Sequence, residues 1–182
     1  VLDGLMQLLE RALVPIQAVR VIAHATTLAT NTIITGKGAK VGLITTQGFR
    51  DILEIQTESR YDVYDLDLQL PPPLVPRYLR REVNERIDHR GKVVQALDTE
   101  EARELLLWFG KQGITDIAVC LMHSYANPSH EQAIRALATE MASGFRLSLS
   151  CELCPEIREY PRVSTTVINA YIRPQITSYV NT

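Results

Sequence analysis

Hydroxyl, amide and imidazole side chains gather in one short stretch of the sequence, residues 24–31. The stretch reads His24-Ala-Thr-Thr-Leu-Ala-Thr-Asn31. It follows a predicted strand and opens a predicted helix, and ligands of open α/β sheets bind at the carboxyl ends of strands. Free backbone N–H groups at a helix N-terminus attract anions, so a phosphate is a natural ligand. The same spacing also fits a simple helix cap with His24 as a buried, hydrogen-bonded histidine.

Two pairs of residues within this stretch share a helical spacing. Thr26 and Thr30 are four residues apart, as are Thr27 and Asn31. Residues at this spacing are neighbours on a helix surface, so polar groups recur around the first turn. We therefore treat Thr26, Thr27, Thr30 and Asn31 as candidate ligand contacts and His24 as a candidate catalytic residue.

A second run of hydroxyl side chains, Ser164-Thr165-Thr166, lies where the last helix is predicted to start, over residues 163–179. A helix start lined with hydroxyl groups repeats the anion-receptive geometry of the first stretch. Thr165 and Thr166 are therefore two further candidate contacts. The charged residues just before them are more typical of solvent-exposed ion pairs.

Two other groups of polar residues have plainer interpretations. His123-Ser124-Tyr125 ends a predicted strand, and a role in a site is as well supported as helix capping with a hydrogen-bonded histidine. Cys151 and Cys154 form a close pair, but no second Cys or His pair completes a tetrahedral metal site. We therefore expect no bound metal at these cysteines.

Apolar runs and helical periodicities alternate along the chain, and these elements must position the candidate residues. Strands are predicted over residues 19–23, 41–45, 117–122 and 145–149, and helices over residues 2–13, 27–35, 49–55, 98–113, 127–141 and 163–179. Parallel strands need crossover connections, which single helices supply. The sequence therefore predicts an α/β fold with a largely parallel sheet and crossover helices.

Residues 56–97 depart from this alternation and are predicted to form an inserted extended or β-hairpin subdomain. Pro71-Pro72-Pro73 favours polyproline II. Asp88-His89-Arg90-Gly91 favours a turn between strands at residues 79–87 and 92–96. We expect residues 1–182 to form a single α/β domain fragment that contains this insertion.

The composition excludes several classes of protein. The 182 residues are 46% hydrophobic and 22% charged, which is typical of a globular domain and unlike a disordered chain. The net charge of -2, without blocks of like charge, argues against nucleic-acid and membrane partners, and no apolar run reaches the roughly 18–20 residues of a membrane span. Three cysteines, an odd number, suit a reducing compartment, so we expect a cytoplasmic protein.

The motifs of the chain are similar, in order, to those of a known family. His24-Ala-Thr-Thr-Leu-Ala-Thr-Asn31 and Gly38-Ala-Lys-Val-Gly-Leu-Ile-Thr-Thr-Gln-Gly-Phe-Arg-Asp-Ile-Leu-Glu-Ile55 resemble the HGTTVATN and GARVGLITTKGFRDVLEI signatures of the hydantoinase/oxoprolinase family. Further segments that resemble this family are residues 64–66, 73–77, 85–87, 118–128, 156–160 and 164–171. The resemblance covers nearly all of the chain from Val21 onward.

The resemblance implies a part of an actin-like (ribonuclease H-like) ATPase fold. It implies an ATP-dependent hydrolase that activates a cyclic amide oxygen, in a lactam or hydantoin, by phosphoryl transfer from ATP with Mg²⁺ before ring opening. A hydantoinase B-type subunit or a fused equivalent would be the partner. Residues 24–31 would then line the nucleotide-phosphate or substrate pocket, with Thr26, Thr27 and Asn31 as hydrogen-bonding contacts and His24 as an orienting or acid/base group.

The chain also departs from the family pattern. The Asp-x-Gly-Gly phosphate motif of family members is absent, and Ala25 stands where the family usually has glycine. We therefore expect the central part of the N-terminal half of a larger enzyme, inactive alone and with weak or no binding of Mg-ATP. The alternative is a non-catalytic α/β interaction module derived from that family. An exposed sheet edge would also allow copies of the chain to associate.

Overall fold

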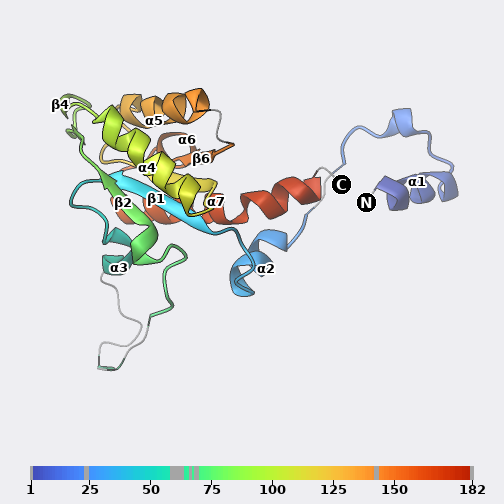
Figure 1. Ribbon diagram of the computed structural model, residues 1–182. Coiled ribbons are helices and arrows are strands. Elements are labelled where there is room, and N and C mark those ends of the chain that lie inside the picture. Colours follow the sequence, from blue (N-terminus) through green and yellow to red (C-terminus); the bar gives the residue numbers. More distant parts are fainter. Residues whose placement is uncertain are drawn as a thin grey trace.

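A parallel β-sheet forms the centre of the molecule (Figure 1). The computed structural model describes residues 2–22, 25–57, 64–65, 67, 70–141 and 144–180. Within these residues the main sheet has the order β2-β1-β5-β6, with all neighbours parallel. The strands are β1 (Val41–Thr46), β2 (Arg80–Val83), β5 (Asp116–Cys120) and β6 (Arg146–Leu149). The predicted α/β fold with a parallel sheet is therefore confirmed.

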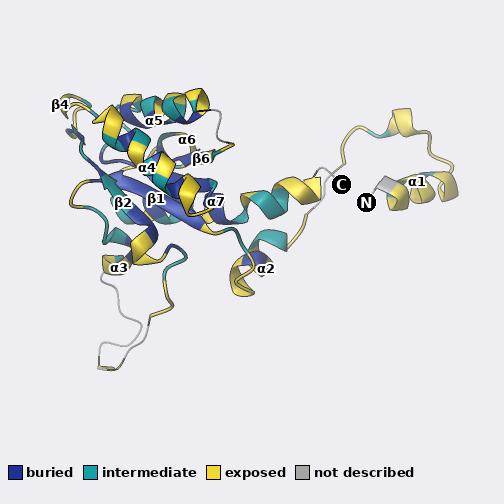
Figure 2. Ribbon diagram, in the orientation of Figure 1, coloured by how far each residue is buried: buried dark blue, intermediate teal, exposed yellow. Residues whose placement is uncertain are grey.

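The two central strands are buried along their whole length because helices cover both faces of the sheet. Every residue of β1 and of β5 is buried, as expected for a parallel sheet in the middle of an α/β fold. Figure 2 shows β1 in the colour of buried residues. Gly42 in β1 admits the ring of Phe109 from α4 (Thr99–Lys111), since a Cβ at this position would lie 2.4 Å from that ring. Because Gly42 has no side chain, the Phe109 ring lies directly against the backbone of β1. Helix α4 therefore packs closer to the sheet than a larger residue at position 42 would allow.

The remaining large helices are α5 and α7. Helix α5 (Ser129–Glu140) packs beside α4, and α7 (Glu159–Val180) crosses β1, β5 and β6 on the opposite face (Figure 1). The short helix α6 (Ser150–Leu153) follows β6 directly. Asp98 caps α4 as predicted, because its side chain accepts a hydrogen bond from the backbone N of Glu101 at 3.0 Å.

Helix α7 begins earlier than the sequence predicts, at Glu159 rather than at residue 163. Pro174 lies inside it. Helix α5 begins at Ser129, with Asn127 accepting from its backbone N at 3.1 Å.

The N-terminal part differs from the prediction at one strand. Helix α1 (Leu2–Arg11) and the 3-10 turn η1 (Ile16–Ala18) lie away from the sheet (Figure 1). Residues 19–22 are not a strand, and Val21 and Ile22 are 82% and 58% exposed. The prediction for these residues is wrong, because in the described part of the chain no strand lies beside the apolar run to pair with it. Residue 23 lies outside the described residues.

Helix α2 (Leu28–Ile34) packs against the C-terminal half of α7, at the amino end of β1 (Figure 1). The backbone N of Ala39 donates to the carbonyl of Tyr171 at 2.9 Å, and Gln175 Nε2 donates to the carbonyl of Lys37 at 2.7 Å. A Cβ on Gly38 would lie 2.1 Å from the Tyr171 ring, so glycine is needed for this close approach.

The region between residues 56 and 97 contributes to two sheets. Strand β2 pairs in parallel with β1, with Leu43 beside Arg80 and Thr46 beside Val83. Strands β3 (Arg86–Ile87) and β4 (Val93–Gln95) form the expected antiparallel hairpin. The predicted strand over residues 79–87 is thus divided between the main sheet and the hairpin.

Two ion pairs hold the base of this region, and they join the start of the helix α3 (Ile52–Ile55) and its interior to the 3-10 turn η2 (Arg77–Leu79) and the residue after it. Arg77 Nε lies 2.8 Å from Asp51 Oδ1, and Arg80 Nη2 lies 2.9 Å from Glu54 Oε1. The hydrogen bond from Arg77 lowers the pKa of Asp51 below its ordinary value. We call these two pairs the stem clamp.

Candidate functional site

The polar stretch at the start of α2 is exposed. Thr26, Thr27, Thr30 and Asn31 all lie at the surface. Thr26 Oγ1 accepts from the backbone N of Leu28 at 3.2 Å, and Asn31 Nδ2 donates to Thr27 Oγ1 at 3.2 Å. Ala25, Thr26 and Thr27 line an open hollow of about 400 Å³. His24, the predicted catalytic residue, lies outside the described residues.

The position of residues 25–31 in the fold differs from the position at the carboxyl end of a strand that the sequence predicts. No strand precedes α2 over residues 19–22, and α2 lies at the amino end of β1 rather than at the carboxyl ends of the strands. Helix α2 has only seven residues. The threonines and Asn31 therefore form a surface of hydroxyl and amide groups, and their role as ligand contacts stays a prediction.

Thr165 and Thr166 do not lie at a helix start. They are the seventh and eighth residues of α7, and only the first four N–H groups of a helix lack a partner within it. Thr166 is fully buried, and its Oγ1 donates to the carbonyl of Arg162 at 2.7 Å. Thr165 is exposed. The anion-receptive geometry that suggested these two residues is therefore absent from their position.

A buried polar network lies at the carboxyl ends of β1 and β5, where the sequence does not predict one. Thr46 Oγ1 accepts from the backbone N of Met122 at 2.9 Å and in turn hydrogen-bonds Glu85 Oε1. Glu85 Oε2 lies 2.7 Å from His130 Nδ1. All three side chains are buried. An ionised Glu85 can only accept, so both Thr46 and Nδ1 of His130 donate to it.

A second chain of hydrogen bonds runs alongside, from α7 to α5. Arg162 Nη1 donates to Ser124 Oγ at 3.3 Å, and Ser150 Oγ donates to Glu131 Oε1 at 2.6 Å. Ser124 and Ser150 are joined at 2.9 Å. Because each hydroxyl has one proton and that of Ser150 goes to Glu131, Ser124 donates to Ser150. The chain therefore runs in one direction, from a buried cation to a buried carboxylate.

The same network fixes the loop that follows β5. Glu131 Oε1 also accepts from the backbone N of Leu121 at 2.9 Å, and Arg162 Nη2 donates to the carbonyl of Leu121 at 2.7 Å. His123 in this loop has a φ of 54°, an uncommon backbone conformation for a residue other than glycine. Its Nδ1 lies 3.1 Å from the hydroxyl of Tyr125. Ser124 therefore has a structural role, while His123 and Tyr125 remain partly accessible.

Two of the three cysteines are held as thiols by their surroundings. Burial raises the pKa of Cys120 to about 12. Burial, with the negative charge of Glu131 close by, raises the pKa of Cys151 to about 12. Neither cysteine is therefore a reactive thiolate at neutral pH.

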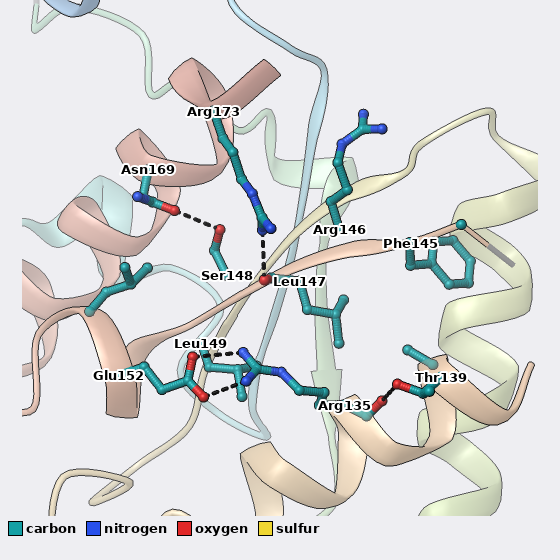
Figure 3. Close-up of a pocket in the computed structure, with 13 residues that line it drawn as sticks. Arg135, Thr139, Phe145, Arg146, Leu147, Ser148, Leu149, Glu152, Asn169 and Arg173 are labelled. Atoms are coloured by element: carbon teal, nitrogen blue, oxygen red, sulfur yellow. Dashed lines mark hydrogen bonds and ion pairs between the residues drawn. The ribbon is translucent and has the colours of Figure 1, made fainter. Parts of the chain in front are cut away.

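A large hollow lies along the edge strand β6, between α5 and α7 (Figure 3). Its volume is about 770 Å³. Its three arginines are all engaged: Arg135 pairs with Glu152 at 2.8 Å, Arg146 with Asp116 at 2.7 Å, and Arg173 donates to the carbonyl of Leu147 at 3.0 Å. The walls therefore offer no guanidinium that lacks a partner.

The described residues supply only a part of what a Mg-ATP site needs. Hydroxyl and amide groups at α2 can donate to phosphate oxygens, but residues 25–35 include no carboxylate for a Mg²⁺ ion, which prefers carboxylate and phosphate oxygens. Across the described part of the chain, no three His, Cys, Asp or Glu side chains gather as a metal site. A complete nucleotide site is not formed by these residues alone.

Sequence reasoning missed the buried network, although a signal for it exists. In α5 the buried Glu131 shares a helical face with Ile134 and Ala138, and in α7 Arg162 shares one with Thr166 and Ala170. A charged residue at an inward position of an amphipathic helix indicates a buried partner.

Each of the helices in the described ranges is too short or insufficiently apolar to cross a membrane.

Known proteins similar to this chain include longer enzymes and enzyme subunits. 5-oxoprolinase 1 of Arabidopsis thaliana is 36% identical over 188 residues, which are 92% of this chain and 14% of that protein. Caprolactamase subunit alpha of Pseudomonas jessenii is 37% identical over 159 residues, which are 86% of this chain and 23% of the subunit.

A solved structure shows the same arrangement of elements. The crystal structure of ATP-dependent caprolactamase from Pseudomonas jessenii matches 98% of this chain and 27% of that chain, with a TM-score of 0.84 and 34% identity. The chain thus spans between 14% and 27% of the length of these relatives. The family model described as the hydantoinase/oxoprolinase N-terminal region matches residues 1–142. The chain belongs to the hydantoinase/oxoprolinase N-terminal region family.

Proposed function

We propose that this chain is a segment of an ATP-dependent enzyme that opens a cyclic amide. The observation that best supports this proposal is the match of 98% of the chain to the structure of an ATP-dependent caprolactamase, at a TM-score of 0.84. The similarity to 5-oxoprolinase 1 supports the same class, since both names describe enzymes of lactam rings.

In the proposed reaction the γ-phosphoryl group of ATP is transferred to the amide oxygen, so that an O–P bond forms, the bond to the β-phosphate breaks and ADP leaves. The carbon of the phosphorylated amide is then more electrophilic, water adds to it, and the ring C–N bond breaks. A second water releases the phosphate from the acyl phosphate that results. Such transfer depends on positioning and on charge stabilisation. We propose that Thr26, Thr27, Thr30 and Asn31 form a hydrogen-bonding edge of the phosphate or substrate pocket, because they are exposed and adjacent. His24 would orient a reacting group or exchange a proton. The carboxylates for Mg²⁺ would come from other parts of the enzyme.

A second subunit belongs to the proposal. The Pseudomonas jessenii relative is named as a subunit alpha. We propose that a hydantoinase B-type subunit, or a fused domain, completes the active enzyme.

Removing the hydroxyl of Thr27 tests the proposed site. In the complete enzyme with its partner subunit, Thr27→Ala should lower kcat for ATP-dependent ring opening by about tenfold or more, the usual effect of losing a hydrogen bond to a charged group. The fold should remain, because Thr27 is exposed and, although it is the N-cap residue of α2, its side chain makes no cap hydrogen bond. Steady-state rates with a lactam substrate and circular dichroism are the measurements.

Thr139→Ala is the matched control. Thr139 is also an exposed helical threonine, whose hydroxyl donates to the carbonyl of Arg135. It should leave the rate unchanged. Wild-type activity in Thr27→Ala would remove Thr27 from the mechanism, and ring opening that does not require ATP would refute the proposed enzyme class.

A further inference from the structure

A small pocket beside the edge strand β2 brings three arginines together. Its volume is about 280 Å³, and it is lined by Gln47, Arg50, Arg80, Arg81, Glu82, Glu101 and Leu105. These residues come from the turn after β1, from β2 and from the first half of α4. The pocket therefore lies near the carboxyl end of β1, where ligands of open α/β sheets bind.

Two of these arginines have unused hydrogen-bond donors. Among the described residues, neither the guanidinium of Arg50 nor that of Arg81 takes part in a hydrogen bond or an ion pair, and the Nε atom of each is buried and unpaired. Buried donors are nearly always paired in folded proteins, because an unpaired one costs free energy. Two such groups in one pocket indicate that a ligand completes their hydrogen bonds.

The third arginine is almost fully buried. Arg80 is 1% exposed, and it donates from Nε to the carbonyl of Val75 and from Nη2 to Glu54 Oε1, both at 2.9 Å. Its Nη1 is buried without a partner in the part of the chain that is described. Since its charge is paired with Glu54, Arg80 contributes a rigid wall and this one unpaired donor.

The guanidinium of Arg81 lies over an aromatic ring. Its central carbon lies 4.0 Å from the centroid of the Trp108 ring. A stacked guanidinium has its plane fixed while its N–H groups, which lie in that plane, stay free. This arrangement is prepared for an oxyanion that accepts two parallel hydrogen bonds.

The two carboxylates of the pocket are engaged by the backbone instead of by these guanidinium groups. Glu82 Oε1 accepts from the backbone N of Gly48 at 2.8 Å and of Arg50 at 3.3 Å. Glu101 Oε2 accepts from the backbone N of Asn84 at 2.6 Å. The large hollow along β6 is different, since each of its arginines is paired. In the smaller pocket, by contrast, Arg50 and Arg81 keep donors that have no partner among the described residues.

We propose that this pocket binds the oxyanion group of a small molecule, either a phosphate or a carboxylate. Arg50 and Arg81 contact the oxyanion, and Arg80 holds the wall behind them. The proposal does not rest on the proposed function, because the pocket lies near the carboxyl end of β1 whereas Thr27 lies beyond its amino end.

Direct titration of the arginine side chains tests this proposal. The protein, labelled with ¹⁵N-arginine, is titrated at constant ionic strength with inorganic phosphate and, separately, with acetate. The Nε–Hε signals of Arg50 and Arg81 are followed by NMR. We expect saturable shifts of both signals. If phosphate saturates the shifts, the natural ligand carries a phosphoryl group. If only acetate saturates them, the ligand carries a carboxylate.

Variants show whether these side chains carry the binding. Arg50→Gln and Arg81→Gln should each raise Kd about tenfold, as expected for one charge-assisted hydrogen bond. Arg81→Lys keeps the charge but loses the planar fork, so it should also weaken binding. Lys111→Gln removes one charge from the far end of α4 and should leave Kd unchanged.

Loss of fold in one variant does not remove the test. Arg50 makes no side-chain hydrogen bond within the described residues, so Arg50→Gln should fold even if Arg81→Gln, which loses the stacking on Trp108, does not. The proposal is overturned if neither anion produces a saturable shift. It is also overturned if Lys111→Gln weakens binding as much as Arg50→Gln.

Discussion

Arg162 carries a positive charge into the interior beneath the ends of β5 and β6. It is 1% exposed, and its guanidinium binds the carbonyl of Leu121 and the hydroxyl of Ser124. Through Ser124 and Ser150 it is connected to the buried carboxylate of Glu131. This single side chain therefore joins α7 to the loop after β5 and, indirectly, to α5.

Replacing Arg162 should destabilise the fold strongly. Arg162→Met leaves the Leu121 carbonyl, the hydroxyl chain and the Glu131 carboxylate without their cation, so we expect the free energy of unfolding to fall by about 2–4 kcal/mol. Urea denaturation measures this loss. Arg103→Met, which breaks an exposed 3.4 Å pair with Glu140, should cost less than about 1 kcal/mol. Equal effects of the two would contradict a central role for Arg162.

At the scale of single residues the sequence predicts caps better than networks. The cap formed by Asp98 was predictable because its partner Glu101 is three residues away. The contacts of Glu85 were not predictable, since Thr46 and His130 lie 39 and 45 residues from it in the chain. Local spacing holds no information on such pairs, since Thr46 ends β1, Glu85 lies between β2 and β3, and His130 is in α5, so that only the tertiary fold brings them together.

Strands were predictable from the sequence where an apolar run lies beside another strand in the fold. The runs at residues 41–45 and 117–122 became the central strands β1 and β5, whereas the run at residues 19–23 has no strand over residues 19–22. The parallel pairing of β2 with β1 crosses a long insertion, so the sequence indicated only a hairpin there. Periodicity indicates which segments can form strands, and tertiary packing decides which do.

The close packing of β1 on α4 can be tested at Gly42. A Cβ at this position meets the Phe109 ring at 2.4 Å. Gly42→Ala should lower the free energy of unfolding by about 1–3 kcal/mol through overpacking. Gly4→Ala in α1, where nothing lies within 4 Å, should be neutral or stabilising. Thermal or urea unfolding of both variants measures the difference, and a stable Gly42→Ala variant would show that the helix can move away from the sheet.

For the molecule as a whole, strand β6 forms one edge of the main sheet. The backbone N of Arg146 faces β5, since it donates to the carbonyl of Thr115 at 2.8 Å, so the next residue, Leu147, points its backbone outward. Arg173 occupies that outward carbonyl at 3.0 Å (Figure 3). A side chain on an outward carbonyl blocks pairing with another strand.

Removing this block should promote association of whole molecules. Arg173→Ala frees the Leu147 carbonyl, so we expect larger species at high protein concentration in analytical ultracentrifugation. Arg103→Ala, which removes a surface arginine of α4, should sediment as the unmodified protein does. Unchanged sedimentation of Arg173→Ala would show that the edge is protected by other means, such as the shortness of β6.

The stem clamp has a consequence for how the chain can vary. Asp51 with Arg77 and Glu54 with Arg80 join the two ends of residues 55–76, a stretch that we call the excursion. The stem clamp therefore fixes the register between β1 and β2, whatever the length of the excursion. Natural insertions and deletions, or a reporter domain grafted near Leu70, should be accepted there without disturbing the sheet.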